Sequence, residues 1–500
     1  CCYICSSLTL NNASMLRFFC TLFCLTLAFA TGAQSLPQLQ NAVNTLEKDP
    51  ELRSGIWSVS VIDMSSGKFI LSHNGYKSLA TASTMKAVTT ATAMAVLGAD
   101  FRFQTILQHD GKIENGILSG NLYIKGEGDP SLGSHRFDSK YQLAQLMIQW
   151  AEQIKKAGIT SIEGRVVADA SFLGTQMVPD DWSWDDISNY YGAGPSGLNI
   201  HENFYRLDFK SGSTGTRTQI LRTDPAIPGI NFHNEVIARG SSDNAYVYGA
   251  PYSYDTYLRG TIPPNRSAFS IKSAIPDPAW YCAYRLSEEL KKCEVSISQT
   301  PTSVRQLKNL DLYRKTTRKL LYTHESPPLR DLVKHTNMES INLYAEALLL
   351  RAAKSRQKGA STAQAANWMQ SYWKEMGVNT KGMNIMDGSG LSPSNGMSTR
   401  QMAKVLYLAS LKPYGIALES SLPLAGRSGS LKSMLKGTAA EGKLRAKSGY
   451  ISGARAYTGY VTTSDGKKLA FSMIANRYSC SAGAMRRKFE TIMVKLAEGR

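Results

Sequence analysis

The chain has 500 residues, a formal net charge of +18, 43% hydrophobic residues and 8 cysteines. This length exceeds what one hydrophobic core usually supports, so we expect several domains or one domain with a large insertion. The apolar content is ordinary, and like-charge runs, low-complexity tracts and solenoid repeats are missing from the sequence, which excludes disordered, collagen-like, coiled-coil and solenoid proteins.

The first segment has the pattern of a secretory signal peptide. An apolar run at 18–30 follows Met15 and Arg17 and ends in small residues up to Ala33. The run is shorter than the roughly 20 residues of a membrane-spanning helix, so a cleaved signal is favoured over an uncleaved anchor. We expect 1–33 to be an upstream extension plus this signal.

Export has consequences for partners and cysteines. The mature protein is expected in the periplasm or cell envelope, with no stable membrane span and no nucleic-acid partner, and its positive charge suits an anionic envelope or a solvated surface. Beyond the leader remain Cys282, Cys293 and Cys480. A bridge between the first two would stabilise by about 2–3 kcal/mol in an oxidising compartment, and two buried thiols are the alternative.

The elements after the leader begin with a short amphipathic helix at 36–52 and two strands at 56–62 and 68–72. An apolar, Ala-rich segment at 83–98 predicts a buried helix that ends at Gly98. From about 105 to 300 the pattern is mostly β, because short alternating segments are separated by Gly, Pro, Asn and Asp.

The basic stretch 305–319 is interpreted as a solvated connection. Helical signals return in four segments, 328–338, 340–355, 362–376 and 398–410. A hairpin signal follows, with strands at 456–463 and 467–474 around Ser464-Asp-Gly466, and a helix at 485–497 closes the chain. A strand pair at each end suggests that both ends share one antiparallel sheet, with the β-rich middle as an insertion.

Several kinds of chemistry are not indicated. The seven histidines form no H-E-x-x-H motif and no zinc spacing with cysteine, so no metal is expected. The segment 437–444 nearly spells a P-loop but lacks the final Ser or Thr, and we interpret it as a surface turn. A G-x-S-x-G nucleophile elbow is missing, which disfavours an esterase of the α/β-hydrolase type.

Three short motifs point to a serine nucleophile. Ser83 and Lys86 form S-x-x-K at a helix start, where positions i and i+3 share a face. A lysine amine can take the serine proton if burial and nearby cations keep it neutral. Ser340-Ile-Asn342 adds a hydroxyl and an amide, and Lys447-Ser448-Gly449 adds a cation and a glycine. A helix cap, a surface lysine and a bulge are the structural alternatives.

The ordered set S-x-x-K, S-x-N and K-[ST]-G resembles the penicillin-recognising serine enzymes. The long stretch between the first two motifs is similar to the D-alanyl-D-alanine carboxypeptidase/endopeptidase family, the low-molecular-mass class C penicillin-binding proteins of the penicillin-binding protein 4 type (peptidase family S13). Further stretches resemble that family: 126–132, 190–193, 326–331, 342–346, 387–392, 422–426 and 429–431.

The resemblance extends from about residue 36 to the end, with three departures. Thr81 stands where the family usually has Pro, and Ser448 replaces the commoner Thr. Pro393 stands where relatives often have Arg, which puts any substrate contact of that Arg in doubt.

The resemblance implies an α+β fold. A catalytic domain of the serine β-lactamase and penicillin-binding transpeptidase type, an antiparallel sheet with helices, would be interrupted by a large β-rich insertion. The catalytic domain would comprise 34–104 and 305–500, and 105–304 would form one or more accessory domains.

The resemblance also implies roles for the motif residues. Ser83 would attack the substrate and Lys86 would act as base, Ser340 would relay a proton, Asn342 would bind substrate and hold Lys86, and Lys447 would keep the cleft positive. Which amine is the acylation base stays open.

On the substrate side, Ser448 and Gly449 would contact the substrate, and the N–H groups of Ser83 and Tyr450 would form the oxyanion hole. Asp169 and Phe172 would touch the side chain of the stem peptide, with a strand-end cap and a core aromatic as their alternatives.

The expected activity is that of an exported serine D-Ala-D-Ala carboxypeptidase, a DD-endopeptidase or both. Its partners would be peptidoglycan stem peptides, with β-lactams as covalent inhibitors, and no cofactor is implied. The alternatives are a β-lactamase or esterase on the same scaffold and a non-catalytic wall-binding module. The oligomeric state stays unassigned.

Overall fold

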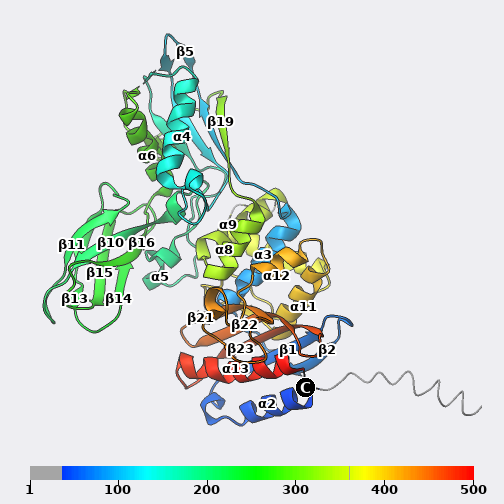
Figure 1. Cartoon of the computed structure of the whole chain (residues 1–500). Coiled ribbons are helices and arrows are strands. Elements are labelled where there is room, and N and C mark those ends of the chain that lie inside the picture. The colour runs from blue at the N-terminus through cyan, green and yellow to red at the C-terminus, as the bar shows by residue number, and fades with distance from the viewer. Residues whose placement is uncertain (1–35, 358, 360, 500) are drawn as a thin grey trace, which may run out of the picture.

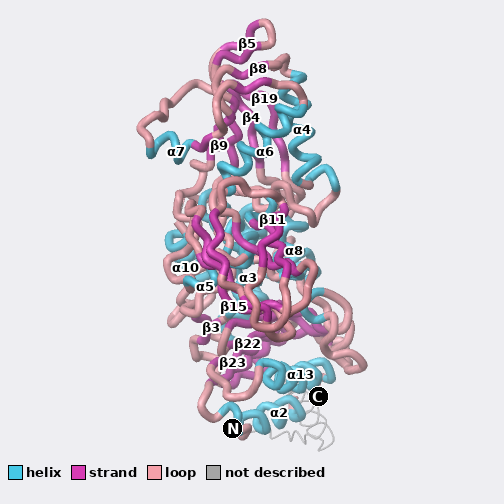
Figure 2. The backbone as a smooth tube through the Cα atoms, turned by 90° about the vertical axis from the view of Figure 1, so that its left-hand side faces the viewer, coloured by secondary structure: helices cyan, strands magenta, loops and turns pink. Residues whose placement is uncertain are grey.

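The computed structural model describes residues 36–357, 359 and 361–499. The expected extension and signal at 1–33 lie outside the described residues. Figure 1 shows a main lobe, made of residues 36–103 and 326–499, and an insertion, residues 104–325, which divides into an upper lobe and a lobe of strands that we call the β lobe. Figure 2 shows that these parts form an elongated molecule, with the upper lobe at one end and α2 and α13 at the other.

The main lobe is built on a five-stranded sheet of order β2-β1-β23-β22-β21, in which every pair is antiparallel. Its strands are β1 (Ile56–Asp63), β2 (Phe69–His73), β21 (Leu444–Ile451), β22 (Ala454–Thr462) and β23 (Lys468–Asn476). Val59 of β1 lies opposite Met473 of β23. The prediction that both ends of the chain share one antiparallel sheet is therefore confirmed.

Helices cover both faces of this sheet. On one face α2 packs beside α13, and on the other α11 contacts β1 and β23 and packs on α3. The strands β1 and β23 are buried almost throughout, because each has a helix layer on both sides. The helices of the lobe are α2 (Pro37–Glu47), α3 (Met85–Leu97), α8 (Leu329–Glu339), α9 (Asn342–Ser355), α10 (Thr362–Glu375), α11 (Thr399–Ser410), α12 (Gly415–Ser421) and α13 (Ala482–Glu498).

The helix α3 has no polar face, since ten of its residues are buried, including Lys86. It runs through the middle of the helical layer and packs against α8, α9 and α11. By contrast α13 is amphipathic, is capped by the Ser481 hydroxyl at its start and ends at Gly499 in the left-handed conformation. Two short strands, β3 (Leu79–Ala80) and β20 (Gly396–Met397), pair beside the start of α3.

The upper lobe packs helices against two sheets, of order β18-β9-β7-β4-β19 and β17-β8-β6-β5. Its helices α4 (Leu143–Lys156) and α6 (Pro278–Lys292) contact each other, and a short α7 (Val304–Asn309) follows β18. The strands are β4 (Gln104–His109), β5 (Lys112–Glu114), β6 (Ile117–Ser119), β7 (Leu122–Gly126), β8 (Ser161–Ile162), β9 (Val166–Asp169), β17 (Ser296–Ile297), β18 (Thr302–Ser303) and β19 (Lys319–Glu325).

The β lobe has two small sheets, β11-β10-β16 and β12-β15-β13, with β14 paired to β15. Its strands are β10 (Phe204–Lys210), β11 (Gln219–Asp224), β12 (Asn231–Asn234), β13 (Ile237–Ala238), β14 (Asn244–Tyr248), β15 (Asp255–Ile262) and β16 (Phe269–Ala274). The short helix α5 (Trp184–Ile187) contacts β14 and lies between the β lobe and the main lobe.

The boundary of the insertion differs from the sequence expectation at its second crossing. We expected the catalytic part to resume at 305, but β19 pairs with β4 inside the upper sheet, so 305–325 belongs to the insertion. The interpretation of 305–319 as a solvated connection is also incomplete, because part of it lies in the helix α7, which begins with a capping box formed by Ser303 and Gln306. Because β19 is an edge strand with one buried residue, His324, which is not apolar, it lacks the apolar alternation that indicates a strand.

The possible bridge between Cys282 and Cys293 is not formed, and both are free thiols, as is Cys480. Cys282 lies within α6 and Cys293 caps the end of that helix. At about 1.5 Å of rise per residue the two Cα atoms are too far apart, because a disulfide needs a Cα separation of about 4.4–6.8 Å. Closeness in sequence is thus misleading when both residues lie on one helix.

Among the described residues, no helix combines the length and the apolar character that crossing a membrane requires.

Candidate active site

The S-x-x-K motif sits where a short 3-10 turn, Ala82–Thr84, leads into α3. Ser83 is partly exposed, while Lys86 is 0% exposed. Ala82 adopts a left-handed φ of 45°, a conformation that costs energy for a residue with a Cβ and that recurs at functional sites. The turn thus presents the Ser83 hydroxyl toward solvent and holds the Lys86 amine behind it.

The Lys86 amine has three acceptors and no contact with water. Its Nζ donates to Ser83 Oγ at 2.9 Å, to Asn342 Oδ1 at 2.6 Å and to the Ser389 carbonyl at 2.7 Å. Burial lowers its pKa from 10.5 to about 7, although the charges of Asp387 and Glu346 oppose the shift. A lysine in this state can exchange a proton with the serine at neutral pH.

The S-x-N motif lies at the junction of two helices. Ser340 has a left-handed φ of 61° at the end of α8, and α9 begins at Asn342, so Ser340 is outside the helix that we predicted to start there. Asn342 Nδ2 donates to the Tyr191 carbonyl at 2.7 Å. This bond turns the amide oxygen of Asn342 toward Lys86.

The second amine comes from strand β21. Lys447 is 0% exposed, and its Nζ donates to Ser340 Oγ at 2.9 Å and to the Ser448 carbonyl at 2.8 Å. Burial and the nearby charge of Lys86 hold the pKa of Lys447 well below its usual range. Each amine therefore has its own hydroxyl, Lys86 with Ser83 and Lys447 with Ser340.

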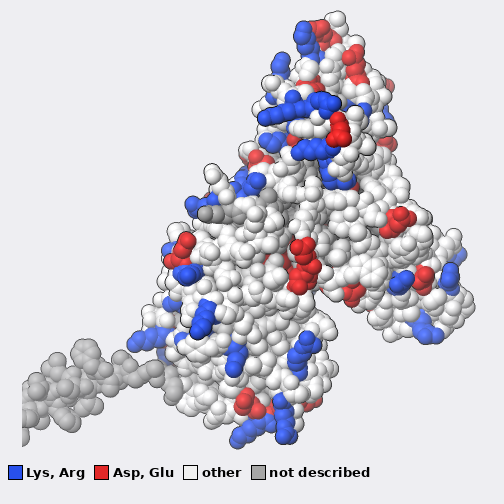
Figure 3. All heavy atoms as spheres, turned by 180° about the vertical axis from the view of Figure 1, so that it is seen from behind, with Lys and Arg blue, Asp and Glu red and all other residues white. Residues whose placement is uncertain are grey.

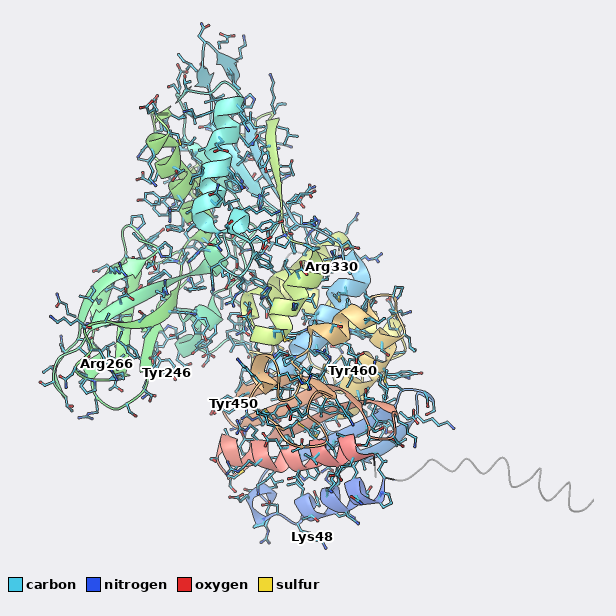
Figure 4. All side chains as sticks on the ribbon, viewed as in Figure 1. Lys48, Tyr246, Arg266, Arg330, Tyr450 and Tyr460 are labelled. Atoms are coloured by element: carbon cyan, nitrogen blue, oxygen red, sulfur yellow. The ribbon has the colours of Figure 1, made fainter. Side chains whose placement is uncertain are left out.

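Beyond Lys447 the strand β21 runs directly past the nucleophile. A Cβ on Gly449 would lie 2.9 Å from the Thr81 carbonyl oxygen and 3.0 Å from the Ser83 nitrogen, so only glycine fits without a shift. Ser448 donates from Oγ to Ser430 Oγ at 2.7 Å. Tyr450 is 55% exposed and lies at the end of β21, on the side of the main lobe that faces the β lobe (Figure 4).

Two buried carboxylates, to which the sequence analysis gave no role, lie behind the amines. Glu346 accepts from the backbone N–H groups of Gly388 at 3.0 Å and Ser389 at 2.7 Å. Burial and the charge of Asp387 raise the pKa of Glu346, and the hydrogen bonds from the N–H groups of Gly388 and Ser389 oppose this shift. The available signal was the position of Glu346 in the otherwise apolar run 343–350 of a helix.

The insertion contacts the main lobe around this site. Trp182 Nε1 donates to Asp387 Oδ2 at 2.9 Å, and Ser392 Oγ donates to Asp181. On the other side Tyr344 Oη donates to Glu202 Oε1 at 3.0 Å. Seen from behind, the surface is hollowed between the β lobe and the main lobe, and lysine and arginine side chains gather on the upper lobe (Figure 3).

Asp169 and Phe172 have partners elsewhere. Asp169 pairs with Arg318 at 2.6 Å, and although burial opposes the shift, Ser171 and Arg318 lower its pKa. Phe172 lies under the guanidinium of Arg351, 5.1 Å from the ring centroid. Among the described residues no hydrogen bond, ion pair or ring contact joins either side chain to Ser83, and a contact of Asp169 and Phe172 with the stem peptide stays a prediction.

The departures at Thr81 and Pro393 have local effects. The buried Thr81 hydroxyl has no hydrogen-bond partner in the part of the chain that the structure describes. Pro393 is exposed and supplies no cation beside Ser392.

Within the described ranges no three His, Cys, Asp or Glu side chains are grouped so that they could hold a metal ion.

The arrangement combines an accessible hydroxyl, an amine of lowered pKa within hydrogen-bond distance, and a second hydroxyl and amine beside them. These are the groups that acyl transfer through a serine nucleophile requires.

Comparisons with known proteins agree with this chemistry. The model of the "D-Ala-D-Ala carboxypeptidase 3 (S13) family" matches residues 39–498. The chain is 28% identical over 499 residues to a D-alanyl-D-alanine carboxypeptidase of Actinomadura sp., covering 94% of this chain and 86% of that protein. It is 26% identical over 453 residues to D-alanyl-D-alanine carboxypeptidase DacB of Haemophilus influenzae, covering 89% and 90%.

Among solved structures, penicillin binding protein 4 (dacB) from Haemophilus influenzae matches with a TM-score of 0.77 and 24% identity, over 91% of this chain and 98% of that one. The same protein complexed with a β-lactam matches with a TM-score of 0.73. These likenesses confirm the predicted fold class, an α+β penicillin-binding fold with antiparallel sheets.

Proposed function

Because this chain belongs to the D-Ala-D-Ala carboxypeptidase 3 (S13) family, we propose that it is an exported serine D-Ala-D-Ala carboxypeptidase that cleaves peptidoglycan stem peptides through an acyl-enzyme at Ser83. The single observation that carries the proposal is the 2.9 Å hydrogen bond between Lys86 Nζ and the accessible Ser83 Oγ. The full set of site residues around this bond is Ser83, Lys86, Ser340, Asn342, Lys447, Ser448, Gly449 and Tyr450.

In the acylation step Ser83 Oγ attacks the carbonyl carbon between the two D-alanines, and neutral Lys86 takes the hydroxyl proton. The assignment of Lys86 as the base rests on contact, because Lys86 donates to Ser83 whereas Lys447 donates to Ser340. With a pKa of about 7, a large fraction of Lys86 is neutral at physiological pH. Water then hydrolyses the ester.

The leaving D-alanine needs a proton, and Ser340 is placed to deliver it. Its hydroxyl accepts from Lys447, so a proton given up by Ser340 to the departing amine can be replaced from the second amine. Asn342 fixes Lys86 through its amide oxygen, and its own orientation is fixed by the Tyr191 carbonyl. A protonated Lys447 would also attract the terminal carboxylate of the stem peptide.

The backbone supplies the oxyanion hole and the strand that holds the substrate. The close approach of Gly449 to the Ser83 nitrogen brings β21 beside the nucleophile, where the N–H groups of Ser83 and Tyr450 can stabilise the tetrahedral intermediate, a contribution of about 3–4 kcal/mol per donor. The Ser448 hydroxyl, which now donates to Ser430, is positioned to bind the substrate carboxylate.

Penicillin would react at the same serine. The β-lactam complex of the Haemophilus influenzae protein supports this expectation. A stable penicilloyl adduct distinguishes the proposed carboxypeptidase from a β-lactamase on the same scaffold, which would turn the antibiotic over, and from a non-catalytic wall-binding module, which would not react.

The test is incubation of the chain beginning after residue 33 with purified muropeptides, followed by mass spectrometry. Loss of one alanine is the expected result, and conversion of cross-linked dimers to monomers would assign DD-endopeptidase activity to the same serine. Ser83→Ala should abolish either reaction, whereas Ser241→Ala, on an exposed turn of the β lobe, should behave as wild type. Unchanged muropeptides with the wild-type chain would refute the proposal.

A further inference from the structure

A buried carboxylate on α9, Glu346, has no part in the mechanism above. It lies one helical turn beyond Asn342 and is 0% exposed. Its two oxygens accept from the backbone N–H groups of Gly388 and Ser389, and Ser389 turns its carbonyl to Lys86 Nζ at 2.7 Å. A single residue, Ser389, therefore connects Glu346 to the amine that takes the Ser83 proton.

A second carboxylate, Asp387, organises the rest of the same loop. It accepts from the N–H groups of Gly390 at 2.6 Å and Ser392 at 2.7 Å, and from the Asn395 side chain at 2.8 Å. Gly390 in turn packs against the residue before the nucleophile, since a Cβ there would lie 1.9 Å from the Ala82 carbonyl oxygen. The loop 387–392 thus supports both Lys86 and the turn that carries Ser83.

The two carboxylates, Glu346 and Asp387, form no salt bridge with a neighbouring cation among the described residues. Both are fully buried, which is costly for a carboxylate. Both Glu346 oxygens accept hydrogen bonds, an arrangement that suits the ionised form. The opposite charge that interacts with them is that of Lys86, which is also fully buried.

We propose, on the basis of the function proposed above, that Glu346 is a positioning residue for proton transfer at Lys86. Its carboxylate holds Gly388 and Ser389 so that the Ser389 carbonyl aims the amine at Ser83. Its negative charge stabilises the ammonium that forms when the proton moves from Ser83 Oγ to Lys86 Nζ as the new C–O bond forms. Glu346 itself neither gains nor loses a proton in this step.

The charged groups around Lys86 fix the sign of the expected effect. Burial lowers the pKa of Lys86, and Asp387 and Glu346 oppose this shift. The remaining titratable neighbour is the Lys447 amine on β21, whose own pKa lies well below its usual range. Glu346→Gln removes one of the two anions, so the pKa of Lys86 should fall. Neutral Lys86 then persists to lower pH, and as a weaker base it reacts more slowly.

The experiment measures the rate of acylation by fluorescent penicillin as a function of pH. For Glu346→Gln the acid limb of the profile should move to lower pH by about one unit, and the plateau rate should fall by about tenfold. The matched control is Thr89→Val, which removes a 2.6 Å hydrogen bond to the Gly388 carbonyl and so loosens the same loop without changing charge. Its acid limb should stay at the wild-type pH.

An acid limb of Glu346→Gln that coincides with wild type, or one that moves equally in Thr89→Val, would overturn the proposal. If the glutamine variant does not fold, Glu346→Asp keeps the charge but shortens its reach, and it should lower the rate with the limb in place. A displaced limb in Glu346→Asp would contradict the role given to the charge. Failure of the wild-type chain to react with penicillin would instead refute the proposed function, so the two failures are distinguishable.

Discussion

Adding one methyl group at Gly449 should separate the fold of this protein from its reactivity. In Gly449→Ala the new Cβ would meet three backbone atoms, the Thr81 oxygen at 2.9 Å and the nitrogens of Ser83 and Thr84 at 3.0 Å each. Backbone cannot rotate away as a flexible side chain can, so β21 and the turn at 82–84 must move apart by several tenths of an ångström. Such overpacking costs about 1–3 kcal/mol of stability.

The effect on acylation should be much larger, because the displaced atoms include the N–H groups proposed for the oxyanion hole. A misplacement of about 1 Å can cost about 100-fold in rate, and we expect a loss of about 10- to 100-fold for the smaller shift here. The assay compares penicillin acylation with thermal unfolding. The control, Gly483→Ala in the first turn of α13, has its nearest atom 3.8 Å away. It should leave the acylation rate unchanged and should not lower the stability, because alanine favours a helix over glycine.

A Gly449→Ala variant that reacts at the wild-type rate would refute the claim that β21 backbone and Ser83 form one reaction surface. The claim would also be contradicted if the loss of acylation rate were fully explained by the fraction of the variant that is unfolded at the assay temperature.

Two further predictions concern the amine and the insertion. The wild-type acylation rate should fall tenfold per pH unit below about 7, where Lys86 becomes protonated, and a limb near the ordinary lysine pKa of 10.5 would contradict the burial argument. Trp182→Phe, which breaks the 2.9 Å bond to the buried Asp387, should lower the free energy of unfolding in urea by about 2–3 kcal/mol. Trp184→Phe, at a 59% exposed position, should change it little, and equal losses would refute the coupling through Asp387.

Local patterns predicted the parts of the fold that depend on neighbours in sequence. The turn at Ser464-Asp-Gly466 connects β22 to β23 as the hairpin signal indicates, and the apolar segment after Ser83 forms α3. The i and i+3 spacing of Ser83 and Lys86 put both on one face, where they meet at 2.9 Å. The shared sheet of the two ends followed from strand pairs at each end.

Features that depend on distant segments were not predictable in this way. The edge strand β19 is recognisable only through its pairing with β4, more than two hundred positions earlier in the chain. The left-handed Ser340 sits outside α9 because α8 must end and turn there. Glu346 and Asp387 acquire a place behind Lys86 only when α9 and the loop 387–392 come together, and Arg318 pairs with Asp169 only across the upper sheet.

The central claim is that Ser83 is the nucleophile of a penicillin-reactive site, and one measurement tests it most directly. The chain beginning after residue 33 is incubated with penicillin, and the adduct is located by peptide mass mapping. We predict one stable penicilloyl group on Ser83, formed in Ser241→Ala and lost in Ser83→Ala. An adduct on another residue, rapid release of hydrolysed penicillin, or no adduct in the wild-type chain would contradict the account.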